Sequence, residues 1–260
     1  MPRWILILVA TPALLYVGLC SLIFVLQRSL IYYPQPISAA AGTETMTLEV
    51  DQARVLVTTS PHDGPAAMIY FGGNAEDVSQ SLPGLQAAFP DRALYLVHYR
   101  GYGGSTGKPS ESALIADALS LFDRVHAKHS NIAVTGRSLG SGIAVQLASL
   151  RPVERLTLVA PYYSLQEIAA KQFPLFPVRW LLLDKFESWR YAAAVTAPTT
   201  IIAAEHDEVI PRASTEALYA HFRQGLATLT VIRGVGHNTI AESPDYIALL
   251  NGAPATGAAR

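Results

Sequence analysis

A short apolar run that leads into a glycine-flanked serine constrains the fold more than any other stretch of this chain. Residues 131–135, NIAVT, are typical of a buried parallel strand. The sequence GRSLG follows and fits the pattern G-x-S-x-G, and a helix-compatible run begins at Ile143. In such a unit the serine occupies a strained turn above the sheet, and glycine is needed where strand and helix approach closely. We therefore expect Ser138 to be a nucleophile rather than an ordinary turn serine.

Strands and helices alternate along the rest of the chain. Further strands are predicted over 66–71, 93–99, 156–160, 199–204 and 227–233, and a β-hairpin over 46–59. Helices are predicted over 76–89, 110–129, 143–150, 211–222 and 244–250. This alternation predicts an α/β fold, a doubly wound and mostly parallel sheet whose site lies at the carboxyl ends of its strands. The expected layout is a linker over 29–45, one domain over 46–250 and a disordered tail over 251–260.

The N-terminus carries an apolar run. No charged residue occurs from Trp4 to Leu26, a length that crosses a bilayer core of about 30 Å. The apolar core of a cleavable signal peptide has only about 7–15 residues, so we expect a retained transmembrane anchor over 1–28. Arg3 and Arg28 flank the run on opposite sides, and the positive-inside rule therefore assigns no orientation.

Composition excludes some classes of partner. A net charge of −1 argues against nucleic acid, which binds a basic face. The single cysteine, Cys20, follows Leu19 where a lipoprotein signal has a small residue, so an apolar helix residue is favoured over lipidation. His126 and His129 lie one helical turn apart, and a solvated helix face is favoured over a metal site. We expect no metal. The sequence leaves the oligomeric state open.

A nucleophilic serine needs a base, and the base needs an orienting acid. After a G-x-S-x-G turn the expected chain order is serine, acid, histidine. Asp207 follows the predicted strand TTIIAA, and His237 lies in GVGHN after the last strand, at the same sheet edge as Ser138. We assign His237 as general base and then general acid, and Asp207 as the carboxylate that fixes its tautomer. Glu205 and Glu208 remain rivals for the acid.

The third component is an oxyanion hole made of two backbone N–H groups. Leu139, directly after the serine, is expected to supply one. Asn74, after Gly72 and Gly73 at the end of a predicted strand, is expected to supply the other. A Gly-Gly pair alone is more often a tight turn, but its position here favours the hole.

A long insertion, residues 162–191, joins the strand after the nucleophile to the strand before the acid. It should therefore form a cap over Ser138. Ten large apolar side chains in about thirty residues exceed what a short cap can bury. We expect part of this surplus, with Tyr162 and Trp180, to bind substrate in an acyl slot or to contact lipid headgroups.

The chain resembles the alpha/beta-hydrolases, and in particular the membrane-anchored branch that includes protein depalmitoylases and related bacterial hydrolases. The resemblance covers about residues 30–250 and rests on GGNAED, YRGYGGSTGKPSE, GRSLGSG, HDEVIP and GVGHN standing in family order. It implies a serine hydrolase acting on acyl esters, thioesters or peptides, with no metal or organic cofactor, in the inner membrane of a bacterium. In one departure, Gly72 replaces the histidine that braces the oxyanion loop.

The leading hypothesis is a membrane-anchored serine hydrolase that cleaves acyl esters or thioesters through an acyl-enzyme on Ser138. Its expected partners are a small-molecule or lipid-like acyl substrate and, through the N-terminal helix, membrane lipid. One alternative is an aminopeptidase with the same triad, although no clear acidic patch for a substrate N-terminus is visible. The other is an inactive hydrolase fold that serves as a membrane interaction module; such proteins usually lose a triad member, and this chain keeps all three.

Overall fold

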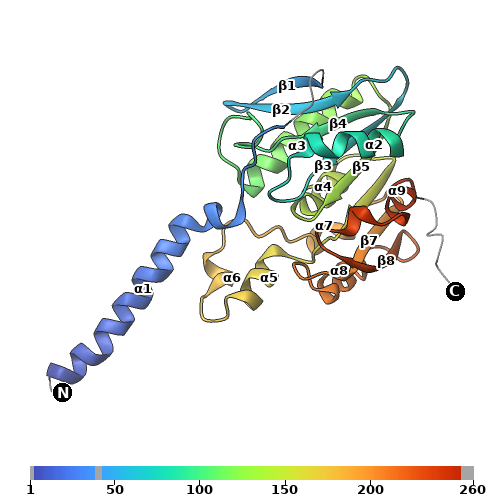
Figure 1. The fold of residues 1–260 in the computed structure, drawn as a ribbon. Coiled ribbons are helices and arrows are strands. Elements are labelled where there is room, and N and C mark those ends of the chain that lie inside the picture. The colour runs from blue at the N-terminus through green and yellow to red at the C-terminus, as the bar shows by residue number, and fades with distance from the viewer. Residues whose placement is uncertain (1–2, 39–42, 253–260) are drawn as a thin grey trace.

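An eight-stranded, mostly parallel sheet forms the centre of the structure, a computed structural model that describes residues 3–38 and 43–252 (Figure 1). The strands are β1 (Glu44–Val50), β2 (Ala53–Ser60), β3 (Ala66–Phe71), β4 (Ala93–Val97), β5 (Asn131–Arg137), β6 (Arg155–Val159), β7 (Thr199–His206) and β8 (Ala227–Gly236). Their order is β1-β2-β4-β3-β5-β6-β7-β8; β1, β2 and β4 pair antiparallel, and all other pairs are parallel. The predicted α/β class with a doubly wound, mostly parallel sheet is confirmed.

Apolar cores lie on both faces of this sheet. Along β3, Met68 and Tyr70 enter one core while Ile69 and Phe71 enter the other, since successive side chains point to opposite faces. The first core is covered by α2 (Leu82–Ala88), α9 (Asp245–Leu250) and the 3-10 turns η1 (Val78–Ser81) and η2 (Ile240–Glu242). The second is covered by α3 (Glu111–His126), α4 (Leu139–Leu150) and α8 (Arg212–Tyr219). Burial on both faces explains why the central strands are continuous apolar runs.

Helix α3 differs from its prediction at its C-terminal end. Its first turn is capped by Ser110, whose hydroxyl accepts a hydrogen bond from the Ala113 N–H at 3.2 Å. The helix ends at His126, so His129 lies beyond it. There His129 is buried and its ring lies 2.8 Å from the Gly64 carbonyl oxygen. The expectation of a solvated face was therefore wrong for His129. Within the described residues, no group of three or more metal-ligating side chains could hold an ion.

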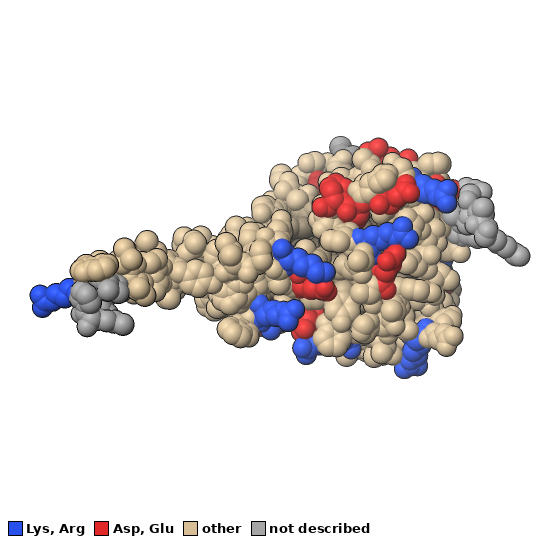
Figure 2. Space-filling model, turned by 90° about the horizontal axis from the view of Figure 1, so that it is seen from below, with Lys and Arg blue, Asp and Glu red and all other residues tan. Residues whose placement is uncertain are grey.

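The cap and the N-terminal helix lie on one side of this body. The cap contains the short helices α5 (Leu165–Gln172), α6 (Val178–Leu181) and α7 (Trp189–Ala192). Helix α1 (Arg3–Ile31) projects away as a rod (Figure 1), and between its basic end and the body its surface carries no charged group (Figure 2). It holds 25 residues, Ile7–Ile31, that are long and apolar enough to cross a membrane. Residues 39–42 of the predicted linker and 253–260 of the predicted tail lie outside the described residues.

Candidate active site

The turn between β5 and α4 holds Ser138 in a strained backbone conformation, with φ 48° and ψ −116°. A Cβ on Gly136 would lie 2.6 Å from the Ala144 Cβ, and one on Gly140 would collide with the Phe71 carbonyl oxygen. The predicted requirement for glycine at both positions is thus confirmed. Because α4 begins at Leu139 rather than at Ile143, strand, serine and helix follow one another without any spacer.

Three side chains from three strand ends form one hydrogen-bonded chain. Ser138 Oγ lies 3.0 Å from His237 Nε2, and His237 Nδ1 lies 2.9 Å from Asp207 Oδ2. An ionised carboxylate only accepts, so Nδ1–H donates to Asp207 and leaves Nε2 free to accept from the serine hydroxyl. Ser138 is 9% exposed and His237 is 6% exposed. Ser138 lines a cavity, so the hydrogen-bonded side chains lie at the floor of that cavity. Asp207 comes from the end of β7, and His237 follows β8.

The rival acids bind main-chain groups instead of the imidazole. Glu205 Oε2 accepts from the Gly234 N–H at 2.9 Å, and Glu208 Oε2 accepts from the His237 N–H at 3.2 Å. Asp207 is itself held by the Ile210 N–H, which donates to its Oδ1 at 2.6 Å. Of the three carboxylates, Asp207 is therefore the one with the geometry of an orienting acid.

The loop after β3 brings the second expected oxyanion donor to the nucleophile. Asn74, Ser138 and Leu139 border the same cavity, and neither the Asn74 nor the Leu139 backbone N–H donates to another described residue. The Asn74 side chain anchors the loop: its Oδ1 accepts from the Tyr102 hydroxyl at 2.8 Å and from the Tyr33 N–H at 3.0 Å. The glycine-rich loop after β4, which supplies Tyr102, thus shapes the site.

A buried carboxylate that the sequence analysis missed holds this loop from within. Glu76 Oε2 accepts from the Gly73 N–H at 2.6 Å and from Arg137 Nη1 at 2.9 Å. Its Oε1 accepts from the Tyr70 and Ser81 hydroxyls, each at 2.8 Å. These contacts brace the loop where the family has a histidine. The one available signal was the position of Glu76 inside GGNAED, because nothing in the sequence pairs it with Arg137.

No room exists for that histidine. A Cβ on Gly72 would collide with Val78 and would lie 3.2 Å from the Glu76 carboxyl carbon. The Gly72 carbonyl oxygen accepts a hydrogen bond from the Tyr99 hydroxyl at 2.7 Å. Burial raises the pKa of Tyr99 well above its usual value, so this hydroxyl stays protonated and keeps donating.

A cavity of about 690 Å³ opens above Ser138 under the cap. Most of its lining is apolar, including Leu165, Ile168 and Leu182 of the cap. Tyr162 also lines it and donates its hydroxyl to the Leu139 carbonyl oxygen at 3.1 Å. Burial raises the pKa of Tyr162, which keeps that donor protonated.

Trp180, the other expected substrate contact, is 86% exposed and does not line the cavity. The reason is that Trp180 lies on α6, a single helical turn of the cap with no buried residue. Helix α1 contributes to the lining instead, through Ile23 and Leu30. The sequence analysis did not foresee this contribution.

No protein-family model matches the chain. An uncharacterized protein of Mycobacterium tuberculosis is 37% identical over 247 residues, which cover 88% of this chain and 87% of the relative. The alpha/beta hydrolase domain-containing protein aho-3 of Caenorhabditis elegans is 30% identical over 69% of this chain and 54% of its own length. The lysophosphatidylserine lipase ABHD12 of Xenopus tropicalis is 33% identical over 44% of this chain and 34% of its own length.

Solved structures share the fold. The esterase Pf2001 of Pyrococcus furiosus superposes with a TM-score of 0.67 over 85% of this chain and 97% of its own, at 17% identity. Est1E of Butyrivibrio proteoclasticus, solved with ferulic acid, gives 0.65 over 80% and 95%, also at 17% identity. The chain belongs to the alpha/beta-hydrolase superfamily. In this alpha/beta-hydrolase, β5, Ser138 and α4 have the strand–turn–helix geometry that gives the superfamily its nucleophile.

Proposed function

We propose that this alpha/beta-hydrolase is a membrane-anchored serine hydrolase that cleaves acyl esters or thioesters. The observation that carries the proposal is the hydrogen-bonded chain from Ser138 through His237 to Asp207 at the floor of an apolar cavity. The strained turn at Ser138 supports it, because strain of this kind is retained where a side chain must be held for chemistry.

Catalysis would run in two steps through an acyl-enzyme. His237 Nε2 takes the proton of Ser138 Oγ while the oxygen attacks the acyl carbonyl carbon. The bond to the leaving alcohol or thiol then breaks, and His237 returns the proton to that group. A water molecule, deprotonated by the same nitrogen, attacks the acyl carbon. The bond to Ser138 Oγ then breaks, His237 returns the proton to Oγ, and the carboxylic acid leaves. Asp207 fixes the tautomer and stabilises the imidazolium throughout.

The charge that forms on the carbonyl oxygen is assigned to the Leu139 and Asn74 backbone amides. Both border the cavity beside the nucleophile and have no acceptor among the described residues. One such donor contributes on the order of 10²–10³ in kcat. The contacts of Glu76 with Gly73 and Arg137 keep the second donor in place.

The cavity favours an acyl group as the part of the substrate that is bound. Its volume, about 690 Å³, lies in the range of small-molecule sites, and its lining is mostly apolar. Lipase and esterase names among the relatives and fold neighbours point the same way. An aminoacyl amide would place a charged amine in a mostly apolar lining at a desolvation cost, and the carboxylate in that lining, Glu208, already accepts from the His237 N–H. Esters and thioesters are therefore favoured over the aminopeptidase alternative.

Helix α1 is assigned as a single-pass anchor, with the inner membrane of a bacterium as the proposed location. Its candidate span covers 25 residues, contains 18 consecutive residues with a mean hydropathy of 2.2, and has no charge between Arg3 and Arg28. Its length exceeds that of a signal-peptide core, which has about 7–15 apolar residues. Membrane lipid is thus the proposed partner of its apolar surface.

Hydrolysis of an ester and thioester panel by the full-length protein tests this proposal. Ser138→Ala should lower kcat by about 10⁴-fold or more. Ser149→Ala is the matched control, since Ser149 lies at the far end of α4 and its hydroxyl donates to the Gln146 carbonyl oxygen. Near-normal turnover by Ser138→Ala would refute the assignment. Faster cleavage of aminoacyl amides than of octanoyl esters would support the peptidase alternative.

A further inference from the structure

One wall of the cavity above Ser138 comes from the N-terminal helix. Ile23, Leu30 and Ile31 of α1 line it together with Phe173 and Phe176 of the cap. The cavity therefore extends from the strand ends to the surface where α1 meets the cap. A simple tether would leave the site complete without it, whereas here the helix supplies part of the lining.

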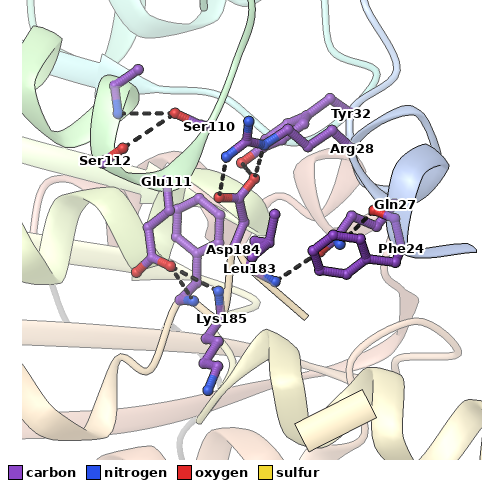
Figure 3. A network of polar contacts seen from close by, with 12 residues as sticks. Phe24, Gln27, Arg28, Tyr32, Ser110, Glu111, Ser112, Leu183, Asp184 and Lys185 are labelled. Atoms are coloured by element: carbon purple, nitrogen blue, oxygen red, sulfur yellow. Dashed lines mark hydrogen bonds and ion pairs between the residues drawn. The ribbon is translucent and has the colours of Figure 1, made fainter. Parts of the chain in front are cut away.

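Polar contacts hold α1 against the cap. Gln27 Oε1 accepts from the Leu183 N–H at 2.7 Å, and Gln27 Nε2 donates to the Leu181 carbonyl oxygen at 3.2 Å. Arg28 Nε donates to Asp184 Oδ2 at 3.0 Å. Figure 3 shows these side chains of α1 pointing toward the segment between α6 and α7. Asp184 is only 3% exposed, and the Tyr32 hydroxyl also donates to its Oδ2 at 3.1 Å.

The same segment is fixed from its other side by helix α3. One oxygen of Glu111 on α3 makes two contacts with this segment. Glu111 Oε2 accepts from the Lys185 N–H at 2.8 Å (Figure 3) and from the Phe186 N–H at 2.9 Å. Since α3 packs on the sheet, these contacts link the segment that binds α1 to the body. The wall of the cavity thus has a defined position relative to Ser138.

Residues 173–176, the tip of the cap, contact α1 near the middle of the helix. Tyr16 donates its hydroxyl to the Leu175 carbonyl oxygen at 2.7 Å, and its ring stacks on Phe176 with centroids 6.3 Å apart. Phe173 and Leu175 at this tip are 49% and 80% exposed. An apolar surface of this kind is typical of contact with another protein or with lipid.

The place of Tyr16 along α1 decides whether the tip of the cap contacts lipid or another protein. The uncharged part of α1 runs from Trp4 to Gln27, and Tyr16 lies near its middle. A bilayer core of about 30 Å needs about 20 residues, so every span placed within this uncharged part includes Tyr16. A spanning α1 therefore carries the tip of the cap into the acyl layer. Ile23, which lines the cavity, then lies toward the Arg28 end of that layer, and Gln27 and Arg28 lie at the polar boundary.

We propose that α1 and the cap together form an acyl slot that opens sideways into the bilayer. Its ligand is the acyl chain of an ester that resides in the same leaflet, and this chain reaches Ser138 without crossing water. The proposal rests on the serine hydrolase function above and adds the substrate's location and two residues of the slot, Ile23 and Leu30, that gauge chain length.

The first test fills the slot from the anchor side. Full-length Ile23→Trp should lower the ratio of palmitoyl-ester to acetyl-ester kcat/KM by about tenfold, the loss from about two methylene groups left unburied. Val25→Trp is the matched control, because Val25 is exposed on α1 and does not line the cavity. A wild-type ratio in Ile23→Trp, with Ser138-dependent acetyl-ester turnover intact, would overturn the slot and leave the proposed function standing.

The second test locates the chain directly in the wild-type protein. A hexadecyl fluorophosphonate with a terminal diazirine is added to the protein in phosphatidylcholine vesicles, and adducts are mapped by mass spectrometry. Phosphonylation of Ser138 with crosslinks to residues 23–31 is the expected result. Phosphonylation of Ser138 with crosslinks only outside α1 would contradict the slot. Failure to modify Ser138 would remove the proposed function and the slot with it.

The third test concerns the route of access. A two-chain ester that does not exchange between vesicles should be hydrolysed at least tenfold faster when it shares vesicles with the protein than when it is in separate ones. Equal rates would overturn sideways access from the leaflet. Acetyl-ester hydrolysis in the same samples reports whether the protein is active in both.

Discussion

Two regions border the same cavity but are held differently. One is the catalytic edge, where Ser138, Asp207 and His237 meet at the strand ends. The other is the α1–cap wall, the part of the lining that α1 and the cap supply. At the catalytic edge each residue directly follows the last residue of a strand, so the sheet itself sets the distances. The α1–cap wall depends on contacts between segments about 150 residues apart, such as Arg28 with Asp184. The comparison predicts that turnover and chain-length selectivity can be changed separately in this molecule.

The largest expected effect comes from the catalytic edge and should be the same for every ester. His237→Ala and Asp207→Asn should each lower kcat by about 10⁴-fold, since the first removes the base and the second selects the wrong tautomer. Kinetics with acetyl and octanoyl esters would measure it. Glu205→Gln is the control, because this carboxylate accepts from the Gly234 N–H and not from the imidazole. Full activity in Asp207→Asn would shift the acid to a neighbouring glutamate.

The next effect concerns the brace of the oxyanion loop. Glu76→Gln should lower kcat by about 10²-fold with little change in KM, because the Gly73 and Arg137 contacts position a transition-state donor. A matched control is Glu154→Gln, which loses an ion pair with Arg92 far from the site. Steady-state kinetics and thermal unfolding should be measured together. A fall in stability with kcat unchanged would assign Glu76 a purely structural role.

A smaller effect is expected when the α1–cap wall is loosened. Arg28→Gln leaves the buried Asp184 with its Tyr32 hydrogen bond alone and should lower the free energy of unfolding by about 1–3 kcal/mol. Denaturant titration of the full-length protein in detergent would measure this, with the exposed Arg233→Gln as control. The same stability in both variants would mean that the Arg28–Asp184 pair does not hold the wall.

The smallest effect is predicted for the exposed residue of the cap. Trp180→Ala should change kcat/KM for acetyl and octanoyl esters by no more than about twofold, since substitutions of exposed side chains usually stay within about 0.5 kcal/mol. A selective loss of tenfold or more for the octanoyl ester would show that Trp180 enters the slot in the working enzyme.

The catalytic edge was accessible from the sequence because its information is local. Ser138, Asp207 and His237 each follow an apolar run and stand in a fixed chain order, and parallel strands bring their carboxyl ends to one edge. Glycine at 136 and 140 followed from the same local packing. The choice of Asp207 over two glutamates needed coordinates, since all three occupy the same short loop.

The α1–cap wall was not accessible from the sequence because its contacts join remote segments. Apolar surplus in the cap was visible, but which side chains turn inward depends on the short helices, and Trp180 turned outward. The pairing of Gln27 and Arg28 with residues 181–184 has no local signature. Glu76 likewise took over a bracing role that the family pattern assigns to a histidine.

Labelling with a fluorophosphonate tests the central claim, that Ser138 is an activated nucleophile, most directly. The full-length protein is treated with the probe, and intact mass and peptide mapping locate the adduct. The account predicts one adduct on Ser138 at neutral pH, lost in Ser138→Ala and strongly slowed in His237→Ala, with Ser149→Ala labelled like the wild type. An adduct on another residue, or hydrolysis that persists in Ser138→Ala, would contradict it.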